Sequence, residues 1–325
     1  MDNQRFRDEA KRILSEGNVR CLIGYSKDAA GFRVSPLFAR TEGDVERLLF
    51  SPLCNISLVN YLTLEKGALL ESGARAEEEK IAIVARGCDS RALCQILAEK
   101  GISRERLIVL GVPCPGVIDL SRIEARFQGR RECAEVTEEG GAYLVRLGND
   151  SYAVPKEELL AEHCKRCSFP NPLVYDVLLG EPVAQRKPSY EDVLAVEAMT
   201  LEEKEKFWKE IFGRCLRCYA CRNACPLCYC DECVLERLSP QWIQRSVNGG
   251  DNLSFHLARA YHLAGRCAGC GECERVCPVN LPLMLLNRKM EKDMQALFGH
   301  TAGTDVEQKP VFSTFDRKDP EDFIL

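Results

Sequence analysis

The sequence repeats one cysteine pattern twice, and this repeat limits what the chain can fold into. Four cysteines stand at the spacing Cys-x2-Cys-x2-Cys-x3-Cys-Pro in a first run, residues 215–226, and in a second run, residues 267–278. A tight loop presents the first three sulfurs of such a run together, and the cysteine before the proline points away from them. Each run is therefore expected to supply three ligands to one metal centre and a fourth ligand to another.

This spacing is that of bacterial ferredoxin [4Fe–4S] ligands, in which the fourth cysteine of each run binds the other cluster. The predicted ligands of one cluster are Cys215, Cys218, Cys221 and Cys277. The predicted ligands of the other are Cys267, Cys270, Cys273 and Cys225. A zinc-ribbon binding protein is the alternative, but zinc usually takes two separated Cys-x2-Cys pairs. Two complete runs that each end in Cys-Pro favour iron–sulfur.

The composition is that of a globular protein, with one anomaly. Of the 325 residues 46% are hydrophobic and 29% are charged, and the net charge of −5 gives no reason to expect a nucleic-acid or membrane partner. The charged N-terminus does not look like a secretory signal, and no apolar run is long enough to span a bilayer, so a cytoplasmic location is expected. The anomaly is the count of nineteen cysteines, which in a reducing compartment indicates metal ligands rather than disulfides.

The N-terminal part alternates strand-like and helix-like segments. The β-branched runs 19–25, 80–86 and 106–112 predict strands, and residues 89–101, between the last two, predict a helix. A strand, helix and strand at that spacing form a βαβ unit and hence a parallel sheet. A Gly-Gly turn at Gly140 predicts a hairpin after it. Residues 1–185 are accordingly predicted to form an α/β domain with a mostly parallel sheet.

The C-terminal part has helical patterns throughout. Thr200 and Glu203 form a capping box that begins one helix, and further helices are predicted over 251–265 and 281–299. About forty residues separate the two runs, and residues 195–295 resemble the α-helical ferredoxin domain of succinate dehydrogenase iron–sulfur subunits and heterodisulfide reductase small subunits. Residues 186–300 are predicted to form an all-α dicluster [4Fe–4S] ferredoxin domain, and residues 301–325 an extended tail.

Four cysteines of the α/β domain form a second candidate site. Cys88 and Cys114 each follow a predicted strand of the βαβ unit, so both are expected at the carboxyl edge of the sheet. Cys88 also stands where a helix begins, which favours thiolate. Cys164 and Cys167 supply a Cys-x2-Cys pair that completes a predicted third [4Fe–4S] site. The alternative is that Cys88 and Cys114 are small buried residues and that only the pair is reactive.

The segments around these cysteines carry a family resemblance. GCDSRA, VPCPG and CKRC resemble the β-subunit family of the deazaflavin-coenzyme-reducing hydrogenases and formate dehydrogenases of methanogens, over residues 20–185. In that family such cysteines accompany a [4Fe–4S] cluster, and a bound FAD passes electrons to or from the deazaflavin. The sequence before the sheet also looks like bacterial relatives that occur with heterodisulfide-reductase-like and hydrogenase-like subunits.

Three leftover cysteines follow the first run directly. They are Cys228, Cys230 and Cys233. Together with Cys54, which SPLCNIS places at an expected helix start where thiolate is favoured, they predict a fourth site for [4Fe–4S] or zinc. Free thiols are the alternative. If the fourth site is occupied as well, only Cys21, Cys94 and Cys133 are left, and they are expected to be core thiols. His256 and His262 lie in a predicted helix without a catalytic grouping and are interpreted as packing or surface residues.

Closely set clusters pass single electrons, so the sequence predicts an electron-transfer subunit of a cytoplasmic anaerobic oxidoreductase complex. The resemblances imply as partners a flavin-containing heterodisulfide-reductase-like subunit and a hydrogenase, formate dehydrogenase or similar catalytic subunit. The alternative is a reductase subunit that uses FAD to act on a diffusible electron carrier. No GxGxxG after a strand and no P-loop motif is present to indicate a nucleotide site.

Overall fold

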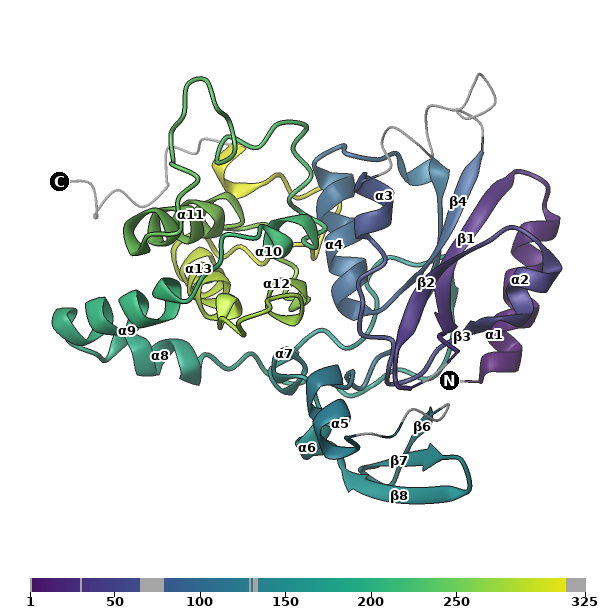
Figure 1. Ribbon diagram of the computed structural model, residues 1–325. Coiled ribbons are helices and arrows are strands. Elements are labelled where there is room, and N and C mark those ends of the chain that lie inside the picture. The colour runs from purple at the N-terminus through teal and green to yellow at the C-terminus, as the bar shows by residue number, and fades with distance from the viewer. Residues whose placement is uncertain (1, 30, 65–78, 129, 131–133, 314–325) are drawn as a thin grey trace. The chain divides into compact units, whose positions relative to one another are not determined.

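The computed structural model describes residues 2–29, 31–64, 79–128, 130 and 134–313, and it contains two compact units (Figure 1). The first unit comprises Met1–Ser90 and Ile102–Pro188, and the second comprises Arg91–Gly101 and Ser189–Leu325. The second unit therefore includes a short segment from the N-terminal part of the chain. No helix in the described part of the chain combines the length and the apolar character that crossing a bilayer requires.

The first unit is an α/β fold. Its strands are β1 (Val19–Lys27), β2 (Val34–Ala39), β3 (Leu48–Leu49), β4 (Lys80–Ala85), β5 (Leu107–Gly111), β6 (Ala134–Glu139), β7 (Ala142–Leu147), β8 (Asp150–Pro155) and β9 (Val177–Leu178). Its helices are α1 (Asn3–Ser15), α2 (Glu42–Glu46), α3 (Asn60–Leu64), α5 (Leu120–Arg126), α6 (Lys156–Leu159) and α7 (Glu162–Lys165). Helix α4 (Gly87–Ala98) begins here, and its residues from Arg91 onward belong to the second unit.

The main sheet is mostly parallel. Among the described residues it has the strand order β2-β1-β4-β5-β9, with β3 beside β1. The pairs β1–β4, β4–β5 and β5–β9 are parallel, whereas β2 and β3 pair with β1 in the antiparallel sense. All residues of β4 except the first are buried, as expected for a central parallel strand with both faces covered. The predicted fold class is confirmed for this part of the chain.

A smaller sheet has the order β6-β7-β8. The predicted hairpin is its first half: β6 and β7 pair in the antiparallel sense across Gly140 and Gly141. Both glycines have positive φ, 57° and 83°, which is the conformation that a two-residue hairpin turn of type I′ requires. The third strand, β8, adds to β7 after a second turn and was not predicted. Cys133, expected to be a core thiol, lies outside the described residues.

The second unit is helical. Its helices are α8 (Glu191–Glu197), α9 (Leu201–Gly213), α10 (Ala220–Asn223), α11 (Gly249–His262), α12 (Glu272–Arg275) and α13 (Leu283–Phe298). The predicted capping box is present at the start of α9, where the Thr200 hydroxyl accepts from the Glu203 N–H and the Glu203 carboxylate accepts from the Thr200 N–H. The predicted all-α fold of this part is confirmed.

One buried core holds these helices together. Phe212 of α9, Phe255 of α11 and Leu283 of α13 belong to this core. Cysteines of both runs also belong to it or pack against it. Residues 301–313 continue beyond α13: the backbone oxygen of Ala302 accepts hydrogen bonds from Nε and Nη2 of Arg91 at 3.0 and 2.8 Å. The remainder of the predicted tail, residues 314–325, lies outside the described residues.

Candidate iron–sulfur sites

The first cavity lies in the second unit and has about 330 Å³ of empty space. The cysteines that line it are Cys215, Cys218, Cys221 and Cys277. Backbone N–H groups stabilise two of these sulfurs: Arg217 donates to Cys215 Sγ and Leu281 donates to Cys277 Sγ, both at 3.4 Å. The cavity thus combines three cysteines of the first run with the last cysteine of the second run.

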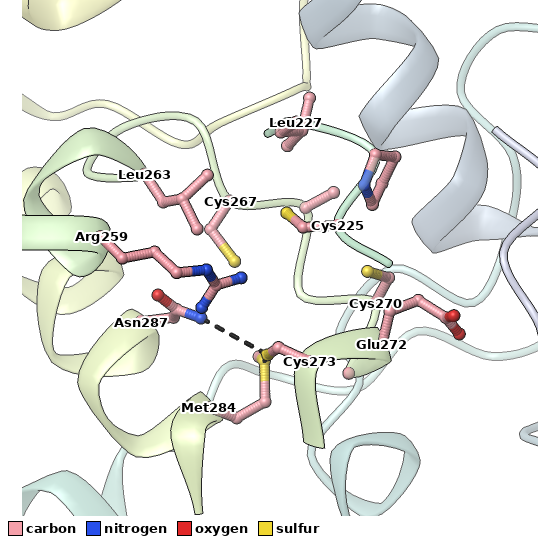
Figure 2. Close-up of a pocket in the computed structure, with 13 residues that line it drawn as sticks. Cys225, Leu227, Arg259, Leu263, Cys267, Cys270, Glu272, Cys273, Met284 and Asn287 are labelled. Carbon is pink, nitrogen blue, oxygen red and sulfur yellow. Dashed lines mark hydrogen bonds between the residues drawn. The ribbon is translucent and has the colours of Figure 1, made fainter. Parts of the chain in front are cut away.

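The second cavity has about 300 Å³ of empty space and the converse composition. The cysteines that line it are Cys225, Cys267, Cys270 and Cys273, and Figure 2 shows their sulfurs facing the same space. Cys273 lies on the short helix α12, Cys267 and Cys270 lie in the loop before it, and Cys225 comes from the first run, just after α10. The structure therefore brings the fourth cysteine of each run to the other run's cavity, as the spacing predicts.

The two runs fold into the same loop. Arg217 and Tyr219 in the first run have φ of 52° and 60°, and the equivalent Gly269 and Gly271 in the second run have φ of 70° and 73°. This left-handed conformation turns the backbone so that its N–H groups face the sulfurs; the Gly269 N–H, for example, bonds to Cys267. It is strained for Arg217 and Tyr219 but not for glycine, which indicates that the loop shape itself is required.

Four sulfurs around one cavity are the donor set of a [4Fe–4S] cluster, which takes one thiolate at each iron corner. Among the described residues, no three His, Cys, Asp or Glu side chains come close enough together to hold a single metal ion. The four thiols of each cavity therefore fit such a cluster. Which thiolates hold iron remains a prediction.

His256 on α11 was interpreted from the sequence as a packing or surface residue, and the structure gives it a further contact. Its ring stacks on Phe212 with centroids 4.7 Å apart, and its Nε2 lies 3.2 Å from Cys215 Sγ. Burial, with Arg259 and Arg217 nearby, lowers the pKa of His256 to about 3, so the ring is neutral. A neutral ring protonated at Nε2 donates a hydrogen bond to the sulfur. His262 is exposed, as expected of a surface residue.

In the second cavity the sulfur of Cys273 has a polar neighbour of its own. The side-chain amide of Asn287 lies 3.8 Å from Cys273 Sγ, as the dashed line in Figure 2 marks. Hydrogen bonds to cluster sulfurs are among the features that set a cluster's reduction potential. Each cavity therefore has its own polar contact, an imidazole in the first and an amide in the second.

Of the three leftover cysteines, Cys228 contacts Cys225, which lines the second cavity. Its thiol hydrogen-bonds to Cys225, and this bond lowers the pKa of Cys225 to about 6 while it raises the pKa of Cys228. Cys225 lines the second cavity, and its lowered pKa favours the deprotonated sulfur that iron binds. Cys230 is exposed, and Cys233 is partly buried against the core of the second unit.

Cys54 does not have the environment expected from the sequence. It lies in a turn whose Cys54 N–H bonds to the Ser51 oxygen, not at a helix start, and its side chain is fully buried. Burial raises its pKa to about 12, so the expectation of a favoured thiolate is wrong. Cys54 belongs to the first unit and the leftover cysteines to the second, and the fourth site remains a prediction. Cys21 and Cys94 are buried, as core thiols should be.

The four cysteines of the predicted third site lie in the first unit. Cys88 is in the first turn of α4, directly after β4, and Cys114 follows β5, the parallel neighbour of β4. Cys164 lies on α7, and its Sγ accepts a hydrogen bond from the Val117 N–H at 3.4 Å. Cys88 and Cys114 each lie near enough to Cys167 for a negative charge on its sulfur to raise their pKa. The expected placement at the carboxyl edge of the sheet is thus present.

Burial dominates the chemistry of this N-terminal group. It raises the pKa of Cys88 and of Cys164, and it raises the pKa of Cys114 to about 12. Without metal these thiols are protonated at neutral pH, so metal binding would release protons. The positive charge of Arg86 acts in the opposite direction on these pKa values, and its guanidinium is held by Asp89, with 2.7 Å between Nε and Oδ2.

Comparison with known proteins matches a family model described as a 4Fe-4S dicluster domain to residues 214–282. The chain is similar to the F420-dependent formate dehydrogenase subunit beta of Methanocaldococcus jannaschii, with 24% identity over 294 residues, 73% of this chain and 77% of the relative. It is also similar to the F420-dependent formate dehydrogenase 1 subunit beta of Methanococcus maripaludis, with 21% identity over 362 residues, 93% of this chain and 90% of the relative.

One solved structure among those that match is a chain of the F420-reducing [NiFe] hydrogenase complex from Methanosarcina barkeri. It has 15% identity and a TM-score of 0.37, and the match spans 48% of this chain and about half, 56%, of that one. The resemblance to the hydrogenase and formate dehydrogenase β-subunit family, joined to a dicluster ferredoxin domain, is confirmed by the curated relatives and the family model.

Proposed function

We propose, from this resemblance and the dicluster domain, that the protein is an iron–sulfur electron-transfer subunit of a formate dehydrogenase- or hydrogenase-type complex. In the finer form of the proposal it relays electrons between a flavin-containing heterodisulfide-reductase-like subunit and a hydrogenase, formate dehydrogenase or similar catalytic subunit. The observation that carries the proposal is the pair of cavities, each lined by four cysteines drawn from both runs.

The surroundings of the cavities support electron transfer. A cluster's potential is set by hydrogen bonds, charge and burial. His256 contacts a sulfur of the first cavity and Asn287 a sulfur of the second. Such contacts act on the electronic state of a cluster. They favour a role in passing single electrons.

The N-terminal cysteines extend the proposal. A third [4Fe–4S] cluster held by Cys88, Cys114, Cys164 and Cys167 would give the chain a redox centre in each unit. Its support is the grouping of these thiols at the carboxyl edge of the sheet beside the buried Arg86. An FAD bound by the first unit would instead favour a reductase subunit acting on a diffusible carrier, and flavin content separates these two functions.

The test begins with tagged protein purified anaerobically from its native host. We expect about four iron and four sulfide for each of three clusters, further iron or zinc only if the fourth site is occupied, and co-purifying subunits that oxidise formate or hydrogen. In that complex, Cys270→Ala should block electron delivery to the flavin partner while the catalytic subunit still reduces a viologen dye. A colourless zinc protein would refute the proposal. Bound FAD with direct reduction of a soluble deazaflavin would establish the reductase function.

A further inference from the structure

Each cluster cavity is lined by one deeply buried arginine. Arg217 lines the first cavity and is 6% exposed, and Arg259 lines the second and is 4% exposed. In Figure 2 the Arg259 guanidinium lies among the residues around the second cavity. The Nε atom of each arginine is buried and has no hydrogen-bond partner among the described residues.

The hydrogen bonds that the two guanidinium groups form go to backbone carbonyl oxygens and, for Arg259, also to cysteine side chains. Arg217 donates to the backbone oxygens of Asp251 at 2.6 Å and Gln244 at 2.8 Å, and it lies over the ring of Phe255. Arg259 donates through Nη2 to the backbone oxygen of Cys221 at 3.0 Å, and it also hydrogen-bonds to the side chains of Cys225 and Cys228. Within the described part of the chain neither pairs with a carboxylate, and the negative groups that act on Arg259 are the cysteine sulfurs themselves.

The other buried arginines of the described residues are neutralised. Arg86 pairs with Asp89 at 2.7 Å, Arg91 with Glu291 at 3.4 Å, and Arg288 with Asp192 at 2.9 Å. The two that lack a carboxylate are the two that line the cysteine cavities. An isolated buried charge is strongly unfavourable unless an opposite charge lies nearby. The cavities therefore call for an anion, and a cluster bound by four thiolates is one.

We propose that Arg217 and Arg259 are positioning residues that set the reduction potentials of the two clusters, an inference that rests on the proposed function. Reduction adds one electron to a cluster, and a fixed cation beside it stabilises that added negative charge. Arg217 acts on the first cluster. Arg259 acts on the second cluster, whose cavity it lines, and to a smaller extent on the first, because its bond to the Cys221 carbonyl places it against that loop as well.

The test is a potentiometric titration of full-length protein followed by electron paramagnetic resonance. Arg217→Met and Arg259→Met remove the charge and keep much of the side-chain volume. Arg259→Met should lower the equilibrium constant for reduction of the second cluster at least tenfold, which lowers its one-electron potential by about 59 mV. The potential of the first cluster should fall by less. Arg217→Met should lower the first alone. Cys218→Ala and Cys270→Ala identify which signal belongs to which cluster.

A matched control is Arg288→Met, since Arg288 is buried in the same unit but already neutralised by Asp192. It should destabilise the protein without moving either potential. The conservative variants Arg217→Lys and Arg259→Lys should restore most of the lost potential, because they return the charge. If a methionine variant loses iron and its lysine counterpart retains it, the charge role is supported.

Two results would overturn the inference. One is a set of unchanged potentials in methionine variants that keep their iron. The other is loss of a cluster that lysine does not restore, which would show a role in packing rather than in charge. Wild-type protein without clusters would refute the proposed function and this inference together. Intact clusters that are indifferent to both arginines would refute the inference alone.

Discussion

Because the two cysteine runs exchange their fourth ligands, a substitution in the first run should damage the cluster of the second run. Sequence order alone would predict damage to the cluster of the first run. Cys225 belongs to the first run, but it lines the second cavity with Cys267, Cys270 and Cys273. Removing the Cys225 sulfur should therefore damage the same cluster as Cys270→Ala. It should spare the cluster of Cys215, Cys218, Cys221 and Cys277.

The magnitude depends on a neighbouring thiol. Each [4Fe–4S] cluster accounts for about four iron, so loss of one from three predicted clusters lowers the iron content by about a third. Cys228 hydrogen-bonds to Cys225, so we expect it to replace the missing ligand in part of the molecules of Cys225→Ala. The single variant should thus lose less than one cluster, and the double variant Cys225→Ala/Cys228→Ala should lose the full four iron.

Iron and sulfide analysis with electron paramagnetic resonance of the reduced proteins would measure this. The double variant and Cys270→Ala should lack the same signal and retain the other. Cys228→Ala alone is the control and should keep both ferredoxin signals, because Cys225, which lines the second cavity, is still present. If the double variant lost the signal that Cys218→Ala removes, the exchanged assignment would be wrong.

Three further predictions concern the other sites. Cys114→Ala/Cys167→Ala should lose about four iron while both ferredoxin signals persist, as iron analysis and paramagnetic resonance would show; a full iron content would contradict the third site. The triple variant Cys228→Ser/Cys230→Ser/Cys233→Ser should lose about four iron and keep both ferredoxin signals if the fourth site holds a cluster. Loss of zinc would show a structural zinc site, and no loss of metal would show that the three are free thiols. Gly87→Ala would put a Cβ 1.9 Å from the Phe169 oxygen, so thermal unfolding should show a destabilisation of about 1–3 kcal/mol or more, and an unchanged melting temperature would contradict the close packing.

Much of the fold and of the cluster sites could be predicted because the signals are local. The spacing within each run determines which sulfurs a short loop presents together, and the fourth cysteine departs from that loop over only a few residues. The capping box at Thr200 and the Gly140–Gly141 turn likewise depend on neighbours within three residues. The strands β4 and β5 follow from β-branched runs and the handedness of the connection between them.

Burial and long-range partners were decided only by the tertiary structure. Cys54 follows a proline in a sequence that suggests a helix start, yet it lies in a turn, and burial raises its pKa to about 12. His256 reaches Cys215, 41 positions away, and Arg259 reaches Cys221, 38 positions away, because α11 packs beside the first run.

His256 and Arg259 stand three residues apart and so share one face of α11. That spacing is the one sequence signal that could have marked the helix as a neighbour of the clusters. The cysteine pattern by itself determined what the chain is built to hold, since a cluster's ligands are specified by spacing within a loop. Only the packed structure decided which charges and hydrogen bonds surround those ligands, because they come from helices that the chain brings together after long connections.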